Sequence, residues 1–234
     1  MITMAKKQII QTIILINVFI YFTFLTIDSL AKNLYYPYSP YLKYTSIILC
    51  FFLTLLINDD GHDKKDTSLL QRALFFTVIA DFFLVILNQA TIGVFFFIFV
   101  QGIHIVRQCR KSNPPRRTLY KIFFFSVLCI LLAITPFVQP IKIDPYLYLV
   151  SVVYAALLLT SLITAIGSQK SMPRKAYFLL VIGMCLFFLC DLNVALFNLV
   201  DNNKPSFFHQ IPFGWLIWFF YLPSQILLSM SGYK

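Results

Sequence analysis

The stretch that decides the fold is Leu70 to Arg107, LQRALFFTVIADFFLVILNQATIGVFFFIFVQGIHIVR. It predicts two hydrophobic helices joined by a very short turn, with Asp81 inside the first helix and His104 inside the second. An ionised carboxylate in hydrocarbon costs several kcal/mol unless it is paired, hydrated or protonated. We therefore expect Asp81 to face a polar cavity and not the lipid.

The composition of the whole chain is that of a polytopic membrane protein. Of its 234 residues, 59% are hydrophobic and only 12% are charged, and the mean hydropathy is +0.80. These values exclude an ordinary soluble domain. Alternation of apolar and polar residues is absent, which disfavours a β-barrel. The predicted fold class is all-α, with residues 1–234 forming a single integral membrane domain.

Eight apolar stretches approach the roughly 20 residues that a helix needs to cross the bilayer core. We expect eight transmembrane helices, approximately at residues 8–27, 41–57, 68–88, 91–109, 118–138, 145–166, 176–199 and 212–230. Tyrosines and tryptophans near the outer ends of these stretches, including Trp215 and Trp218, are expected to anchor the helices at the membrane surface.

The distribution of Lys and Arg predicts the orientation in the membrane. If the N-terminus is cytoplasmic, the cytoplasmic segments contain Lys6, Lys7, Lys64, Lys65, Arg107, Arg110, Lys111, Arg116, Arg117, Lys170, Arg174, Lys175 and Lys234. The outer loops contain only Lys32, Lys142 and Lys204. By the positive-inside rule, both termini are cytoplasmic. We expect a multi-pass integral membrane protein, in a bacterial plasma membrane.

The remaining charged and cysteine residues favour no cofactor, metal or nucleic acid. The net charge of +10 comes from basic residues dispersed among membrane loops, which fits contact with anionic membrane lipids better than nucleic-acid binding. The acidic stretch NDDGHDKKD at residues 58–66 is expected to be a solvated turn. The five cysteines contain no CxxC pair and are expected to be small buried hydrophobic residues.

Two carboxylates are predicted at the same depth. The helices that contain Asp81 and Asp191 run in the same direction, and both residues lie roughly 20 Å from the cytoplasmic end at about 1.5 Å per residue. Tyr221 in the last helix reaches the same level. The pairs Gln101 with His104 and Tyr221 with Gln225 are each spaced to project from one helical face. The two carboxylates could therefore share one polar cavity, as opposed to making separate structural hydrogen bonds.

A short internal similarity supports this pairing. The segments ADFFLVILN at residues 80–88 and CDLNVALFN at residues 190–198 both place an asparagine seven residues after the aspartate. Asn88 and Asn198 would then lie on the same helical faces as the two aspartates. Four helices separate the two segments, so they would form a parallel 4+4 repeat. By contrast, Asn17 and Tyr154 are interpreted as interhelical hydrogen-bonding residues.

These residues resemble the YhhN-like lysoplasmalogenase family of eight-span membrane proteins. The resemblance rests on the Asp of ADFFLVIL, the F-x-x-G-x-H of FVQGIH, the Asp of CDLNVALF, and the Tyr and Gln of YLPSQ. It covers nearly the whole length. The chain departs from the family at Ala80, Cys190 and Arg107, where the family tends to have Gly, Ser and an aromatic residue.

The resemblance implies hydrolysis of the vinyl ether bond of a lysoplasmalogen, a lysophospholipid, without a cofactor. On this hypothesis one of Asp81 and Asp191 is protonated and acts as the general acid, while the other is ionised and activates water. The substrate or the water would be oriented by His104, Gln101, Tyr221, Gln225, Asn88 and Asn198. Two alternatives stay open: a small transporter or lipid-binding protein with a carboxylate proton or cation relay, and a scaffold without a small ligand. The sequence contains no argument for an oligomeric state.

Overall fold

The computed structural model describes residues 4–30, 38–57, 60–138, 144–170, 172–199 and 212–234. These residues form eight α-helices: α1 (Met4–Leu30), α2 (Ser39–Leu55), α3 (Lys64–Asp81), α4 (Ala90–Cys109), α5 (Pro114–Val138), α6 (Pro145–Gly167), α7 (Arg174–Leu199) and α8 (Phe213–Met230). A π-helix, η2 (Phe82–Ile86), continues α3, and a short 3₁₀-helix, η3 (Ser168–Lys170), follows α6. The described part of the chain contains no strand, so the all-α prediction is confirmed.

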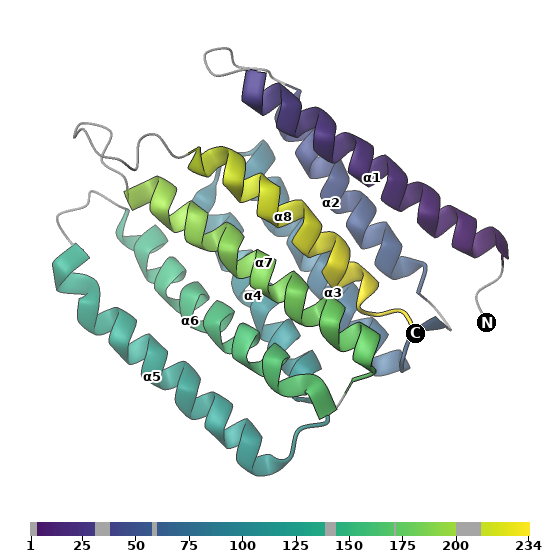
Figure 1. The fold of residues 1–234 in the computed structure, drawn as a ribbon. Helices are drawn as coiled ribbons and strands as arrows, with labels where there is room; N and C mark the ends of the chain where they lie inside the picture. The colour runs from purple at the N-terminus through teal and green to yellow at the C-terminus, as the bar shows by residue number, and fades with distance from the viewer. Residues whose placement is uncertain (1–3, 31–37, 58–59, 139–143, 171, 200–211) are drawn as a thin grey trace.

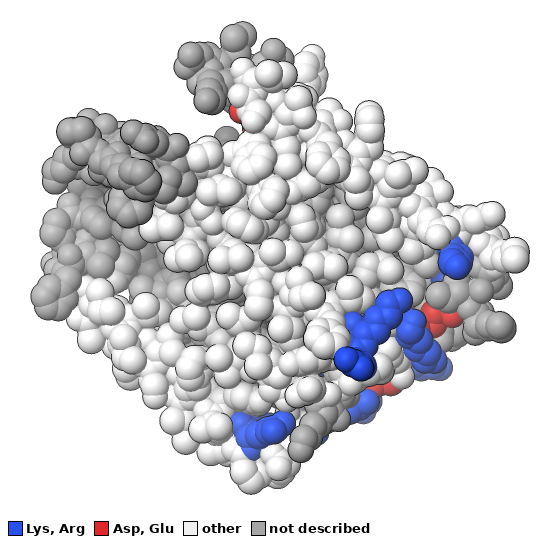
Figure 2. Space-filling view, viewed as in Figure 1, with Lys and Arg blue, Asp and Glu red and all other residues white. Residues whose placement is uncertain are grey.

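The helices have the dimensions and surface of a membrane protein. Seven of them are long and apolar enough to cross a membrane, and α2 is the shorter exception with 17 residues. Large apolar side chains face outward, such as Leu15 at 70% and Phe125 at 60% exposure. In Figure 2 the visible surface is almost free of charged residues, and Lys and Arg gather along one edge. An apolar surface this extensive fits burial in lipid and not in water.

Both ends of the described chain meet at that basic edge (Figure 1). The Lys6 ammonium donates to the Ile57 carbonyl at 3.2 Å and pairs with Asp60 at 2.5 Å. The backbone N–H of Lys234 donates to the Asp60 carbonyl at 3.0 Å. By the positive-inside rule we expect this edge to face the cytoplasm, and the orientation stays a prediction.

Two helical hairpins, α3–α4 and α7–α8, form the part of the bundle that matters for the site. In each hairpin a glycine lies at the contact between the two helices. A Cβ atom on Gly93 would lie 3.0 Å from the Ala80 carbonyl oxygen, and one on Gly183 would lie 3.0 Å from the Leu228 side chain. The absence of a side chain at these positions lets the paired helices approach closely. Helix α6 packs against both α4 and α7, whereas α5 lies at the outside of the bundle against α6 (Figure 1).

The third predicted span is confirmed as an apolar span at Lys64–Ile86, but its outer end is not α-helical. The α-helical geometry stops at Asp81 and the chain continues as the π-helix η2, after which Asn88 has a positive φ of 53° and is exposed. The wider π-helical turn and the end of the helix break the 3.6-residue repeat on which the prediction depended. Asn88 therefore does not lie two α-helical turns beyond Asp81. In contrast, α7 continues without interruption past Asn198.

Candidate functional site

Two tyrosine–aspartate pairs lie inside the bundle. The Tyr221 hydroxyl of α8 donates to Asp81 Oδ2 of α3 at 2.6 Å, and the Tyr154 hydroxyl of α6 donates to Asp191 Oδ2 of α7 at 2.6 Å. Asp81 is buried at 2% exposure, whereas Asp191 is half-buried. Each carboxylate thus has one oxygen fixed by a phenol from a neighbouring helix, and Asp191 is the more accessible of the two.

Aromatic rings join the two pairs into one cluster. The Phe97 ring of α4 contacts the rings of Tyr154 and Tyr221, with centroid distances of 5.9 and 6.4 Å. Phe187 of α7 packs edge-on against Phe97 at 5.9 Å and against Tyr221 at 5.7 Å. Phe97 and Phe187 therefore connect the two tyrosine–aspartate pairs through ring contacts. That the two carboxylates share one polar cavity, as the depth argument expects, stays a prediction.

Two further predicted site residues lie on the buried face of α4. Gln101 is fully buried and accepts a hydrogen bond of 2.6 Å from the Ser161 hydroxyl, and its side chain adjoins Tyr154. His104 is 1% exposed, and its Nδ1 has no hydrogen-bond partner among the described residues. Gln101 extends the tyrosine–aspartate cluster. His104 is buried three residues after Gln101 in the same helix, but it makes no described hydrogen bond to either carboxylate.

The other predicted orienting residues, Gln225, Asn198 and Asn88, differ in burial and in hydrogen bonding. Gln225 is buried at 1% exposure, and its amide nitrogen lies 3.4 Å from the neighbouring Ser224 hydroxyl. Asn198 is exposed and donates to the Val194 carbonyl of its own helix at 2.7 Å. Asn88 is exposed beyond the π-helix. Within the described part of the chain, none of these three makes a side-chain hydrogen bond to Asp81 or Asp191.

Tyr154 is the residue that sequence reasoning missed. The sequence interpretation of Tyr154 as an interhelical hydrogen-bonding residue agrees with the hydrogen bond that it makes. The acceptor, however, is Asp191, one of the two predicted catalytic aspartates. Helix α6 precedes the α7–α8 hairpin, so no spacing rule connects Tyr154 with Asp191. The only signal available was a hydrogen-bonding side chain in the middle of an apolar helix.

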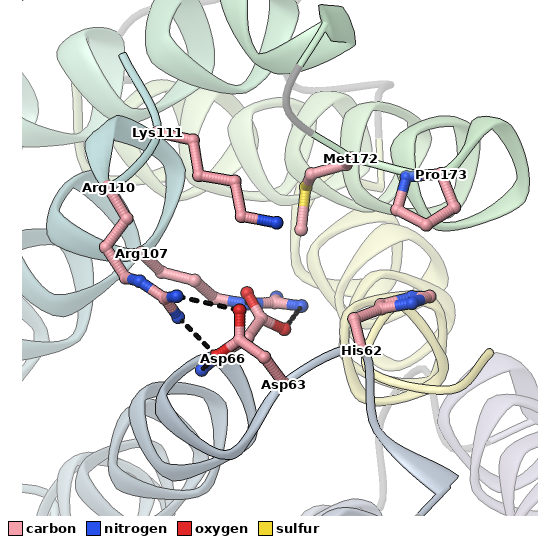
Figure 3. Close-up of a pocket in the computed structure, with 8 residues that line it drawn as sticks. All are labelled: His62, Asp63, Asp66, Arg107, Arg110, Lys111, Met172 and Pro173. Carbon is pink, nitrogen blue, oxygen red and sulfur yellow. Dashed lines mark hydrogen bonds and ion pairs between the residues drawn. The ribbon is translucent and has the colours of Figure 1, made fainter.

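A second polar cluster closes the cytoplasmic end (Figure 3). The Arg107 guanidinium, buried at 3% exposure, donates to both carboxylate oxygens of Asp66 at 3.0 and 2.9 Å and to the Ser231 hydroxyl at 2.9 Å. Arg110 binds Asp63 in the same bidentate way, at 2.9 and 2.7 Å. These hydrogen bonds hold the pKa of the Asp63 carboxyl well below its usual range. Arg107, one of the positions that depart from the resembled pattern, thus forms a buried ion pair with Asp66.

The predicted solvated turn at residues 58–66 is wrong at its end: residues 58 and 59 lie outside the described residues, and Asp66 is only 6% exposed. Asp66 lies in the first turn of α3 and is buried because this turn packs against Arg107 in the last turn of α4. The cluster surrounds a cavity of about 20 Å³, lined by the residues drawn in Figure 3: His62, Asp63, Asp66, Arg107, Arg110, Lys111, Met172 and Pro173. That volume has room for about one water molecule and not for a lipid. The cavity is therefore structural, and it is separate from the two carboxylates.

Comparison with known proteins gives one result. The model of the YhhN family matches residues 38–232. The matched region includes both tyrosine–aspartate pairs and the Arg107–Asp66 ion pair, and it leaves α1 outside. Searches of curated proteins and of solved structures found no match.

Proposed function

The chain belongs to the YhhN family, and we propose that it hydrolyses the vinyl ether bond of a lysoplasmalogen or a related ether lysolipid. The products would be a fatty aldehyde and a glycerophospho-base. One observation carries this proposal: two carboxylates on apolar helices each have the Oδ2 atom bound to a tyrosine hydroxyl, and the Phe97 ring contacts both tyrosines. A site of this kind supplies a proton donor and a proton acceptor away from bulk water.

The chemistry needs one acid and one base. The protonated aspartate gives its proton to the alkenyl carbon that is not bound to oxygen, which forms an oxocarbenium ion. The ionised aspartate takes a proton from water as the water oxygen bonds to the cationic carbon, which forms a hemiacetal. In the collapse of the hemiacetal the first aspartate takes the hydroxyl proton and the second gives its proton to the leaving glycerol oxygen. Both aspartates then return to their starting states.

The tyrosines and the surrounding rings would support these steps. A phenol on Oδ2 fixes the orientation of each carboxylate and directs Oδ1 to the reacting atoms. Because Asp191 is half-buried and Asp81 is buried, water would enter on the side of Asp191. The acid and base roles are proposed for the pair, and neither role is assigned to one aspartate.

The experiment compares two lipids on the detergent-purified protein, a lysoplasmalogen and its saturated alkyl-ether analogue, with fatty aldehyde as the readout. Release of aldehyde from the lysoplasmalogen alone is the expected result, because only a vinyl ether gives a stabilised cation on protonation. Release from neither lipid would contradict the proposal.

A second candidate function is transport by a carboxylate relay. It is favoured by two features near the carboxylates: the π-helix η2 directly after Asp81, and Pro223 within the continuous helix α8. π-Helical turns often lie at functional sites, and broken helices are typical of transporter binding sites. Solute uptake by proteoliposomes without any aldehyde formation would decide for transport.

A further inference from the structure

Lys43 is a cation set apart from the basic cytoplasmic edge. It lies about one turn into α2, at the opposite end of the bundle, and its ammonium pairs with Asp28 of α1 at 2.7 Å. The two side chains are 14% and 21% exposed, so both are largely desolvated but reachable. The Ser39 hydroxyl donates to Asp28 at 2.7 Å and fixes the carboxylate. The ion pair is thus built at fixed positions and not left between mobile surface chains.

The ion pair adjoins the proposed active site. The Lys43 ammonium lies 5.1 Å from the centroid of the Trp218 ring, which packs edge-on against Tyr221 at 5.3 Å. Tyr221 in turn donates to Asp81. The Tyr44 ring of the same helix lies 5.9 Å from that of Phe82, the residue after Asp81. Two side chains, Trp218 and Tyr221, thus connect Lys43 to Asp81 through three contacts.

We propose that Lys43 and Asp28 recognise the zwitterionic phospho-base headgroup of the lipid, an inference that rests on the proposed function. Lys43 binds the phosphate, Asp28 binds the ammonium of the base, and Trp218 offers its ring face to the same ammonium. On binding, Lys43 and Asp28 would each exchange the other for the headgroup group of opposite charge. The zwitterionic headgroup therefore adds no net charge to the site. A purely structural ion pair would make no distinction among headgroups.

The chemistry of the lipid supports this placement. In a lysoplasmalogen only the glycerol backbone separates the phosphate from the alkenyl ether. A phosphate held by Lys43 therefore brings the vinyl ether toward Asp81 and Asp191. The lysine also offsets the repulsion that a phosphate would meet from an ionised carboxylate in the site.

The test measures binding and not turnover, so its failure can be told apart from failure of the proposed reaction. The probes are three saturated lipids that cannot undergo vinyl ether cleavage: an alkyl-glycerophosphoethanolamine, an alkyl-glycerol phosphate and an alkylglycerol. Each is titrated into the full chain in nanodiscs. Tryptophan fluorescence gives the readout, because the chain has two tryptophans and Trp218 contacts Lys43. The wild type is expected to bind the phosphoethanolamine lipid about tenfold tighter than the alkylglycerol.

Three variants locate the headgroup. Lys43→Gln should remove most of the tenfold preference and leave alkylglycerol binding unchanged. Asp28→Asn should lower the affinity for the phosphoethanolamine lipid and leave the affinity for the phosphate lipid unchanged. Lys121→Gln, the same change at an exposed position of α5, should leave all three affinities as in the wild type. Equal wild-type affinity for the three lipids would overturn the proposal. A Lys43→Gln variant with the same loss of affinity for all three lipids would also overturn it.

Discussion

Tyr221 donates a hydrogen bond of 2.6 Å to Asp81, although 140 positions separate the two residues in the sequence. Tyr154 and Asp191 repeat this arrangement with the same distance, and the Phe97 ring contacts both tyrosines. The site is therefore a pair of tyrosine–aspartate units contributed by α3 with α8 and by α6 with α7. This geometry leads to specific expectations for activity and stability.

Removal of either phenol should slow the reaction without unfolding the protein. Tyr221→Phe and Tyr154→Phe each delete one hydroxyl and keep the ring, so the carboxylate loses its fixed orientation while packing is preserved. We expect aldehyde release to fall about tenfold in each variant, in line with the loss of one charge-assisted hydrogen bond. Tyr146→Phe serves as the control because Tyr146 is 75% exposed. Full activity in both buried variants would show that the phenols have no role in positioning.

Gly93 should be required for the approach of α4 to α3 next to Asp81. In Gly93→Ala the new Cβ would lie 2.4 Å from the Leu84 side chain and 3.0 Å from the Ala80 carbonyl. We expect a lower melting temperature in detergent and lower activity, because the carbonyl next to Asp81 must shift. The matched control is Gly102→Ala in the same helix, where no described atom outside the local helix backbone lies within 4 Å of the new Cβ. That variant should be as stable as the wild type or more stable by about 1 kcal/mol. Equal melting temperatures for the two variants would contradict this account.

The buried ion pair at the cytoplasmic end should be costly to break on one side only. Arg107→Met leaves the Asp66 carboxylate buried without its guanidinium, which should lower the free energy of unfolding by about 3–5 kcal/mol. The double variant Arg107→Met with Asp66→Leu should recover much of that loss, since no buried charge then remains unpaired. Chemical unfolding in detergent measures both effects, with Lys175→Gln at an exposed position as the control. Additive losses in the double variant would rule out the coupling.

The pH dependence of stability should report the ion pair between Asp63 and Arg110. Hydrogen bonds from Arg110 lower the pKa of Asp63 in the folded state below its ordinary value of 3.8. A carboxyl with a lowered folded-state pKa stabilises the fold above its unfolded pKa, and this contribution is lost as the pH falls from about 3.8 toward the folded-state value. Asp63→Asn should therefore melt below the wild type at neutral pH, and the two melting curves should converge in acid. A gap of constant size from pH 7 to pH 3 would contradict the assignment.

The sequence predicted the bundle because membrane helices leave two strong signals, apolar length and the asymmetry of Lys and Arg. The depth of Asp81 and Asp191 followed from the same regularity, since the rise per residue is constant along a helix. The outer end of the third span could not be predicted, because a π-helical turn after Asp81 leaves no mark in hydropathy. The pairing of Arg107 with Asp66 was missed for another reason. It depends on how the first turn of α3 packs against the last turn of α4, and the charge pattern of residues 58–66 looks like that of a solvated turn.

The most direct test of the central claim is aldehyde release from a lysoplasmalogen by purified variants in which each buried aspartate is replaced by asparagine. Asp81→Asn and Asp191→Asn keep the side-chain size and the ability to accept from tyrosine, but neither can exchange the proton that the reaction needs. We predict that each variant loses activity by a factor of about a hundred or more. Asp144→Asn, at the exposed N-cap of α6, should retain it. Full aldehyde release by both Asp81→Asn and Asp191→Asn would contradict the account.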